Sequence, residues 1–310
     1  MRERLVQDKI WKYWVLKAAY IVLGRLSLRT LYGIAHLVGD GAYLVRPKMR
    51  RGVIANMRRV MGPEASEREV HRAAREVFRN ATRYYADLLH LPRMDAQRFL
   101  REQLDLEGVE YLRAARDSGR GAVVVSAHYG NPEMAAQGLA AAGFRIFSLT
   151  EPLRPKELSE FTHWLRSQHG HEFRTLSFGA VKEAVRRLRS GGIVALLLDR
   201  DVTGSGVPMQ LFGAETRIPL GAVELALRTG ADLIPAWAWR IDGYRFHARV
   251  GPPMELVRTG DLQHDVRVNA ARLLALFEVQ LRVDPGQWAV LESIWREREP
   301  AQAASSGALQ

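Results

Sequence analysis

From about Leu104 onward, short and continuously apolar segments alternate with amphipathic segments of helical length. Apolar segments bounded by glycines predict strands that alternate with helices. Because strands that are apolar throughout lie in a sheet covered on both faces, the sequence predicts an α/β fold with a central, mostly parallel sheet flanked by helices. We expect strands at 122–127, 145–150, 172–176, 193–198, 233–239 and 244–250, and helices at 132–142, 155–168, 179–190, 221–229 and 261–283.

The first hundred residues have helical spacing instead. Ser66 and Glu69 have the form of a capping box, and apolar residues recur at helical spacing from Val70 to Leu89. We therefore divide the chain into a helical N-terminal region, 1–103, and an α/β domain, 104–299. The last residues, 300–310, are small and polar, and a disordered tail is expected there.

Positive charge is concentrated in a basic, amphipathic arm near the start of the chain. Residues 1–60 hold 13 Lys and Arg against three acidic residues, and so carry +10 of the net charge of +11. Segment 10–28 mixes Trp and Tyr with Lys, and segment 46–61 places basic residues between apolar ones. This composition suits the surface of an anionic membrane; a solvated helix face and a nucleic-acid site are the alternatives. No nucleic-acid-binding motif supports the last of these, and we expect no nucleic-acid partner.

The arm does not have the pattern of a membrane-spanning segment. Lys17 and Arg25 interrupt its apolar residues, so the longest uncharged stretch is much shorter than a bilayer requires. The broken apolar run also lacks the cleavage site of a secretory signal.

Two predicted strands end in residues that carry chemistry. The strand at 122–127 is followed by His128, and the strand at 193–198 by Asp199-Arg200-Asp201. Sites collect at the carboxyl ends of strands in open α/β sheets, and an imidazole there can act as a general base. Such a base needs a carboxylate to hold its tautomer, and Glu133 and Asp199 are the two candidates. For each residue, a cap, a turn or a core contact is the structural alternative.

The composition excludes several other chemistries. The chain has no cysteine, which excludes disulfides, cysteine-ligated zinc, iron–sulfur clusters and a cysteine nucleophile. His163, His169 and His171 cross a helix end without the spacing of a metal site. We therefore expect no metal and no cofactor.

His128 and Glu133 also form an H-x4-E motif, which resembles the H-x4-D/E motif of the glycerolipid and lysophospholipid acyltransferase superfamily. Other stretches are similar to the lipid A lauroyl acyltransferase family, and within it to the phosphatidylinositol mannoside acyltransferases of actinobacteria. These stretches are Trp11, Tyr13 and Trp14, Arg46-Pro47, Asn56, His128-Tyr-Gly-Asn131, Glu151-Pro-Leu, Asp199-Arg200-Asp201, Leu211-Phe-Gly213, Pro219 with Gly221, Gln287-Trp288 and Ile294-Trp295. The resemblance covers about residues 10–296.

The resemblance implies a glycerolipid acyltransferase-like fold with His128 as the general base. In the mannoside branch the acid matching Asp199 orients this histidine, whereas elsewhere in the superfamily the motif acid, here Glu133, does so. The chain departs from lipid A enzymes, which usually show Asn-Trp-Glu at the position of Asn131-Pro132-Glu133. The candidate substrate-binding residues are Asn131, Glu151, Arg154, Arg166, Arg200 and Asp201.

The implied reaction moves a fatty acyl chain from acyl-CoA or acyl-carrier protein to a hydroxyl of a phosphatidylinositol mannoside-like or lipid A-like glycolipid. A lysophospholipid acyltransferase and a non-catalytic lipid-binding member of the fold are the alternatives. Backbone N–H groups near Gly130 and in the helix after Pro132 are expected to stabilise the oxyanion. The implied location is peripheral, on the cytoplasmic face of a bacterial cell membrane.

Overall fold

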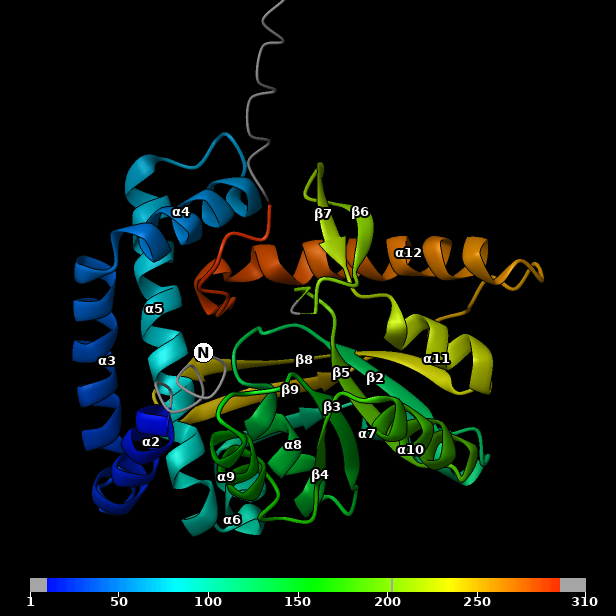
Figure 1. Ribbon diagram of the computed structural model, residues 1–310, viewed down its shortest axis with the longest axis horizontal. Coiled ribbons are helices and arrows are strands. Elements are labelled where there is room, and N and C mark those ends of the chain that lie inside the picture. The colour runs from blue at the N-terminus through cyan, green and yellow to red at the C-terminus, as the bar shows by residue number, and fades with distance from the viewer. Residues whose placement is uncertain (1–9, 202, 296–310) are drawn as a thin grey trace, which may run out of the picture.

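The structure is a computed structural model that describes residues 10–201 and 203–295. Within these residues a seven-stranded sheet has the order β1-β9-β8-β2-β5-β3-β4 (Figure 1). Neighbouring strands pair in parallel except β8 with β9, so the mostly parallel sheet is confirmed. The strands are β1 (Leu104–Glu107), β2 (Ala122–Ser126), β3 (Ile146–Thr150), β4 (Glu172–Thr175), β5 (Ile193–Leu197), β8 (Asp232–Asp242) and β9 (Arg245–Val250).

Helices cover both faces of the sheet, which explains why β2 and β5 in its centre have runs of consecutive apolar residues. In β2, Val123 and Val125 join one apolar core, whereas Ala122 and Val124 join the core on the opposite face. Figure 1 shows α12 above the sheet and α8 below it. The first core includes side chains of α10 (Phe178–Arg189), α11 (Gly221–Thr229) and α12 (Leu262–Val283), and the second those of α7 (Val109–Asp117) and α8 (Pro132–Ala141).

The N-terminal region is helical, as predicted, and α3 and α5 pack side by side along the left edge of Figure 1. Gly39 permits this approach, because a Cβ there would lie 2.8 Å from the Arg79 Cα. The capping box of Ser66 and Glu69 starts α5. No helix in the described residues has both the length and the apolar character needed to cross a bilayer. The helices are α2 (Ile10–Val22), η1 (Leu23–Arg25), α3 (Leu28–Val45), α4 (Pro47–Met61), α5 (Glu67–His90), η2 (Leu91–Arg93) and α6 (Ala96–Glu102).

Three strands were not predicted. β1 has only four residues, and its two acids hide the strand pattern. The other two, β6 (Val207–Leu211) and β7 (Ala214–Ile218), form a separate antiparallel hairpin. Helix α9 (Lys156–Arg166) flanks β4, close to its predicted bounds. The domain boundary at residue 103 stays a prediction, and the tail 300–310 lies outside the described residues.

Candidate active site

The pairing of β2 with β5 brings the two predicted chemical residues together. The strands run parallel, with Ser126 beside Leu197, so the residues two positions further along also lie side by side. His128 Nδ1 is 2.8 Å from Asp199 Oδ1, and the His128 backbone N–H donates to Asp199 Oδ2 at 3.0 Å. The imidazole is partly exposed, whereas the Asp199 side chain is fully buried. The pair therefore presents one accessible base backed by a carboxylate.

Trp288 provides a third hydrogen bond to the Asp199 carboxylate. Its indole Nε1–H donates to Asp199 Oδ2 at 2.8 Å, and the Trp288 side chain is itself completely buried. Burial alone raises the pKa of Asp199, but the charge of His128 and the hydrogen bonds from His128 and Trp288 outweigh it and lower the pKa below its ordinary value. Asp199 is therefore held as a carboxylate, which places the imidazole proton on Nδ1.

The segment after α12 also fixes the backbone around His128. Gly130 N–H donates to Gln287 O at 2.8 Å, and Ala289 N–H donates to His128 O at 2.8 Å. Gly130 has φ +61, and a Cβ there would lie 2.0 Å from Ala238 O, so only glycine fits. The Gln287-Trp288 pair, which is part of the family resemblance, thus holds the loop and the acid of the site.

The predicted oxyanion donors were the N–H groups near Gly130 and in the helix after Pro132. This prediction is wrong for those N–H groups whose hydrogen-bond partners the structure shows. Gly130 N–H is bonded to Gln287 O, and Pro132 has no N–H. The N–H groups of Glu133 and Met134 donate to Asn131 Oδ1, because Asn131 is the N-cap of α8. None of these groups is left for a substrate oxygen.

Glu133 contacts Arg166 and not His128. Arg166 Nε donates to Glu133 Oε2 at 2.8 Å, and its Nη2 donates to Oε1, which makes a bidentate pair between α8 and α9. Both side chains are largely buried, and the guanidinium lies 4.1 Å from the ring centre of Phe173. Burial lowers the pKa of Arg166, but the charge of Glu133 outweighs it and raises the pKa above its usual value. Glu133, the acid of the H-x4-E motif, thus links α8 to α9 and stabilises the helix that follows His128.

Asn131 belongs to a buried polar network that sequence analysis did not find. Its Nδ2 donates to Asp87 Oδ2 at 2.6 Å, and Arg240 Nη2 donates to the same oxygen at 2.7 Å. Tyr32 donates to Asp87 Oδ1, and Arg240 Nη1 donates to the Tyr32 hydroxyl oxygen at 2.8 Å. The network joins α3, α5, β8 and the cap of α8. Its members are more than a hundred residues apart in places, so no local signal marks them.

The other substrate-binding candidates lie beyond the ends of β3 and β5. Arg200 Nε donates to Glu292 Oε1 at 2.9 Å, and Arg200 Nη2 is 3.9 Å from Glu151 Oε2. Asp201 has a buried side chain that lies 3.5 Å from Arg217 Nε. Arg154 is exposed. Because Arg200 follows Asp199 directly, the Arg200–Glu151 pair borders the His128 site.

The three histidines near residue 170 have separate partners. His163 Nε2 is 2.8 Å from Thr150 Oγ1, and His169 Nδ1 is 2.7 Å from Gln137 Oε1. His171 Nε2 donates to Ala136 O at 2.6 Å. These contacts explain the three residues as structural.

Comparison with known proteins identifies the family of the chain. Residues 2–297 match the model of a family described as bacterial lipid A biosynthesis acyltransferase. The chain belongs to the bacterial lipid A biosynthesis acyltransferase family. It is similar to a phosphatidylinositol mannoside acyltransferase of Mycolicibacterium smegmatis, 33% identical over 216 residues that cover 69% of each chain. A protein of the same name from Mycobacterium tuberculosis is 30% identical over 282 residues, covering 88% of this chain and 86% of its own.

Membership of the lipid A acyltransferase family confirms the resemblance seen in the sequence and the enzyme class, an acyltransferase. It also gives the His128–Asp199 pair a chemical context, because acyl transfer to a hydroxyl needs a base.

Proposed function

We propose that this enzyme transfers a fatty acyl chain from a thioester, acyl-CoA or acyl-carrier protein, to a hydroxyl of a phosphatidylinositol mannoside-like glycolipid. The observation that carries the proposal is the His128–Asp199 pair at the carboxyl end of β2, in a chain of this family. The names of the mycobacterial relatives support the acceptor class.

The proposed mechanism uses His128 as a general base. Asp199 accepts a hydrogen bond from the Nδ1–H of the imidazole, which leaves the lone pair of Nε2 for the acceptor hydroxyl. As Nε2 takes the hydroxyl proton, the oxygen attacks the thioester carbonyl and forms a tetrahedral intermediate. The intermediate collapses, the C–S bond breaks, and the imidazolium returns the proton to the leaving thiolate. The products are an ester and a free thiol, and the buried Asp199 charge stabilises the transient imidazolium.

The N-terminal helices supply a surface suited to a bilayer. On α2, Trp11, Trp14, Val15 and Val22 point away from the protein at helical spacing and are more than half exposed. The opposite face of α2 packs on α9, where the rings of Tyr20 and Trp164 are 5.4 Å apart. On α3, Leu37, Val38, Leu44 and Val45 are also exposed. Exposed aromatic and aliphatic residues beside Lys12 and Lys48 suit the headgroup layer of an anionic membrane. Because the cytoplasmic leaflet is the anionic one, our proposal includes a peripheral location on the cytoplasmic face of the cell membrane.

The first test is acyl transfer from radiolabelled acyl-CoA to the total lipid of an actinobacterial membrane. We expect wild type to label a glycolipid and His128→Ala to be slower by about 10²–10⁴-fold, the usual contribution of a general base. His264→Ala is the matched control, because His264 is exposed at the start of α12, and it should retain the wild-type rate.

Other outcomes would contradict parts of the proposal. A His128→Ala enzyme as active as His264→Ala would refute the role of His128. A labelled phospholipid in place of a glycolipid would support the lysophospholipid alternative. The absence of a labelled lipid product with both acyl-CoA and acyl-carrier protein would favour a lipid-binding protein over an enzyme of this specificity.

A further inference from the structure

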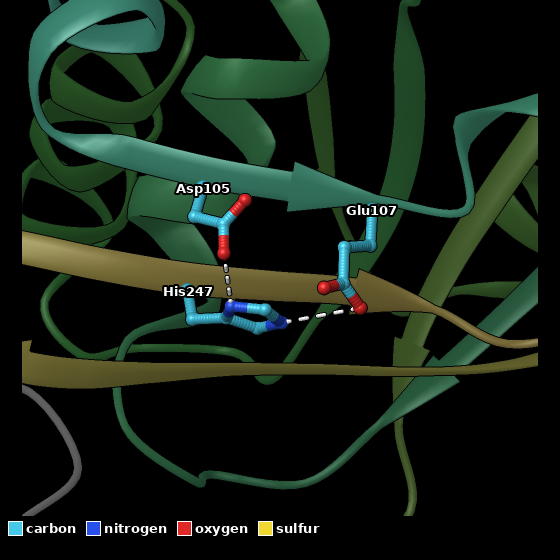
Figure 2. Close-up of side chains that lie close together, drawn as sticks. All are labelled: Asp105, Glu107 and His247. Carbon is cyan, nitrogen blue, oxygen red and sulfur yellow. Dashed lines mark ion pairs between the residues drawn. The ribbon is translucent and has the colours of Figure 1, made fainter.

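A group of metal-ligand side chains lies on the sheet away from the His128–Asp199 pair. Figure 2 shows Asp105 and Glu107 on β1 with His247 on the adjacent β9. The parallel register places Asp105 beside His247, and alternate residues of a strand point to the same face, so Glu107 joins them. One donor atom from each residue lies within 4.8 Å of the others.

The imidazole of His247 has one satisfied nitrogen and one that is not. Nδ1 is 2.7 Å from Asp105 Oδ2, whereas Nε2 is buried and has no hydrogen-bond partner among the described residues. His247 is only 8% exposed, and its ring stacks on Trp239 with 4.3 Å between centroids. Its Nε2 points toward Glu107 Oε2, 3.5 Å away (Figure 2).

This arrangement favours a positive charge between Nε2 and the Glu107 carboxylate. When Asp105 holds the proton on Nδ1, the lone pair of Nε2 faces the negative Glu107 carboxylate, and the two repel each other. Two ligands about 2.0–2.1 Å from a tetrahedral ion are about 3.4 Å apart, close to the separation found here. Histidines that bind metals usually donate their other N–H to a carboxylate, as His247 does to Asp105.

We propose that Glu107 and His247 bind a divalent metal ion of the zinc class, with water completing the coordination and Asp105 orienting the imidazole. The nitrogen ligand favours zinc over magnesium or calcium, which take oxygen ligands. The ion links the short edge strand β1 to β9, and it stabilises that edge without entering acyl transfer. The pattern of the sequence does not predict this site, because β1 is short and His247 lies far along the chain from Asp105 and Glu107.

Arg249 is the competing cation at this site. Its Nε is 3.1 Å from Glu107 Oε2, and its side chain is about half exposed. A bound ion takes this carboxylate oxygen from Arg249, which then turns to solvent. Removal of the Arg249 charge should therefore tighten metal binding, an effect that a purely structural ion-pair cluster does not produce.

The test is calorimetric titration of Zn²⁺ into the chelator-treated full-length protein, with the thermal midpoint as a second measurement. We expect one zinc site in wild type that is lost in His247→Gln and retained in His264→Gln, the matched variant of an exposed histidine. Asp105→Asn should weaken binding by about 10–100-fold, as is usual for outer-shell partners. Arg249→Gln should strengthen it, and zinc should raise the midpoint of wild type but not of His247→Gln.

Two results would overturn the proposal. One is equal zinc binding by wild type, His247→Gln and Glu107→Gln; the last variant changes a half-exposed side chain and keeps the test valid if His247→Gln does not fold. The other is weaker binding after Arg249→Gln, because the ion would then not compete with that guanidinium.

Discussion

At the residue scale, the chemistry depends on how Asp199 is held. The carboxylate accepts from His128 Nδ1, from the His128 backbone and from Trp288 Nε1, and it has no exposed surface. Three donors on two oxygens fix both its charge and its orientation. The position of the imidazole therefore follows from contacts that are present before a substrate binds.

Replacement of Asp199 by Asn should reduce kcat strongly. The amide keeps the shape of the carboxylate but presents N–H groups to donors, so it favours the wrong imidazole tautomer. We expect kcat to fall by about 10²–10⁴-fold with little change in KM, measured against Asp117→Asn, an exposed residue of α7. A rise in KM with an unchanged kcat would instead assign Asp199 to substrate binding.

Replacement of Trp288 by Phe should have a smaller effect of the same kind. A hydrogen bond to a charged group contributes about 1.5–3 kcal/mol, so kcat should fall about tenfold or more. Loss of this donor raises the pKa of Asp199, and the acid limb of the kcat profile should move to higher pH. A lower melting temperature with an unmoved pH profile would mean that Trp288 only fills space.

At the element scale, the strands with a double-faced apolar pattern were predicted, and so was the short, polar β4, whereas β1 and the hairpin strands β6 and β7 were not. β2 and β5 bury residues on both faces, and such burial requires consecutive apolar residues, which are visible in the sequence. β1 alternates Leu with acids over four residues, and its pairing with β9 is a long-range event. The sequence likewise placed His128 and Asp199 at strand ends, but their register came only from the sheet. Nothing local distinguishes Glu133 as a partner of Arg166 from Glu133 as a partner of His128.

The outer face of α2 should be required for membrane binding. Transfer of about 100 Å² from each exposed Trp into the headgroup layer is favourable by about 2.5 kcal/mol at about 25 cal/mol per Å². We expect Trp11→Ser with Trp14→Ser to reduce flotation with phosphatidylinositol-containing vesicles by at least about tenfold, while Phe178→Ser, at an exposed position of α10, has no effect. Equal flotation of wild type, the double Trp variant and Phe178→Ser would place the membrane contact elsewhere. If flotation is lost only when salt is added, and not in the double Trp variant, the attachment is purely electrostatic.

At the scale of the whole molecule, buried polar groups tie distant elements together and make stability depend on their protonation. The network of Asp87 and Arg240 joins the N-terminal helices to β8, with both side chains nearly inaccessible. Removal of one partner alone would leave a buried charge uncompensated. His171 is a second such group, because it links β4 to α8 and to β3.

His171 should make the fold less stable in acid. Burial lowers its pKa to about 4, from an ordinary 6.5. Its Nε2–H donates to Ala136 O, and its unprotonated Nδ1 accepts the Ile146 N–H at 3.2 Å, so a second proton would remove an acceptor. Between these pKa values the unfolded chain binds a proton that the folded chain does not. Stability is therefore complete above about pH 6.5, falls toward about pH 4 by about 3 kcal/mol, and loses nothing further from this group below that pH.

The measurement is the free energy of unfolding in urea at several pH values for wild type and His171→Gln. The variant should be less stable at neutral pH but show a shallower decline in acid, because it has no proton to gain. His36, His90 and His163 also have lowered pKa values, caused first by burial, so the His171→Gln variant keeps a residual slope and only the difference between the two proteins reports on His171. Parallel curves would show that His171 takes up its proton as easily in the folded chain as in the unfolded one. The interior between α8 and β3 would then have to admit an imidazolium, which the two hydrogen bonds of His171 do not allow.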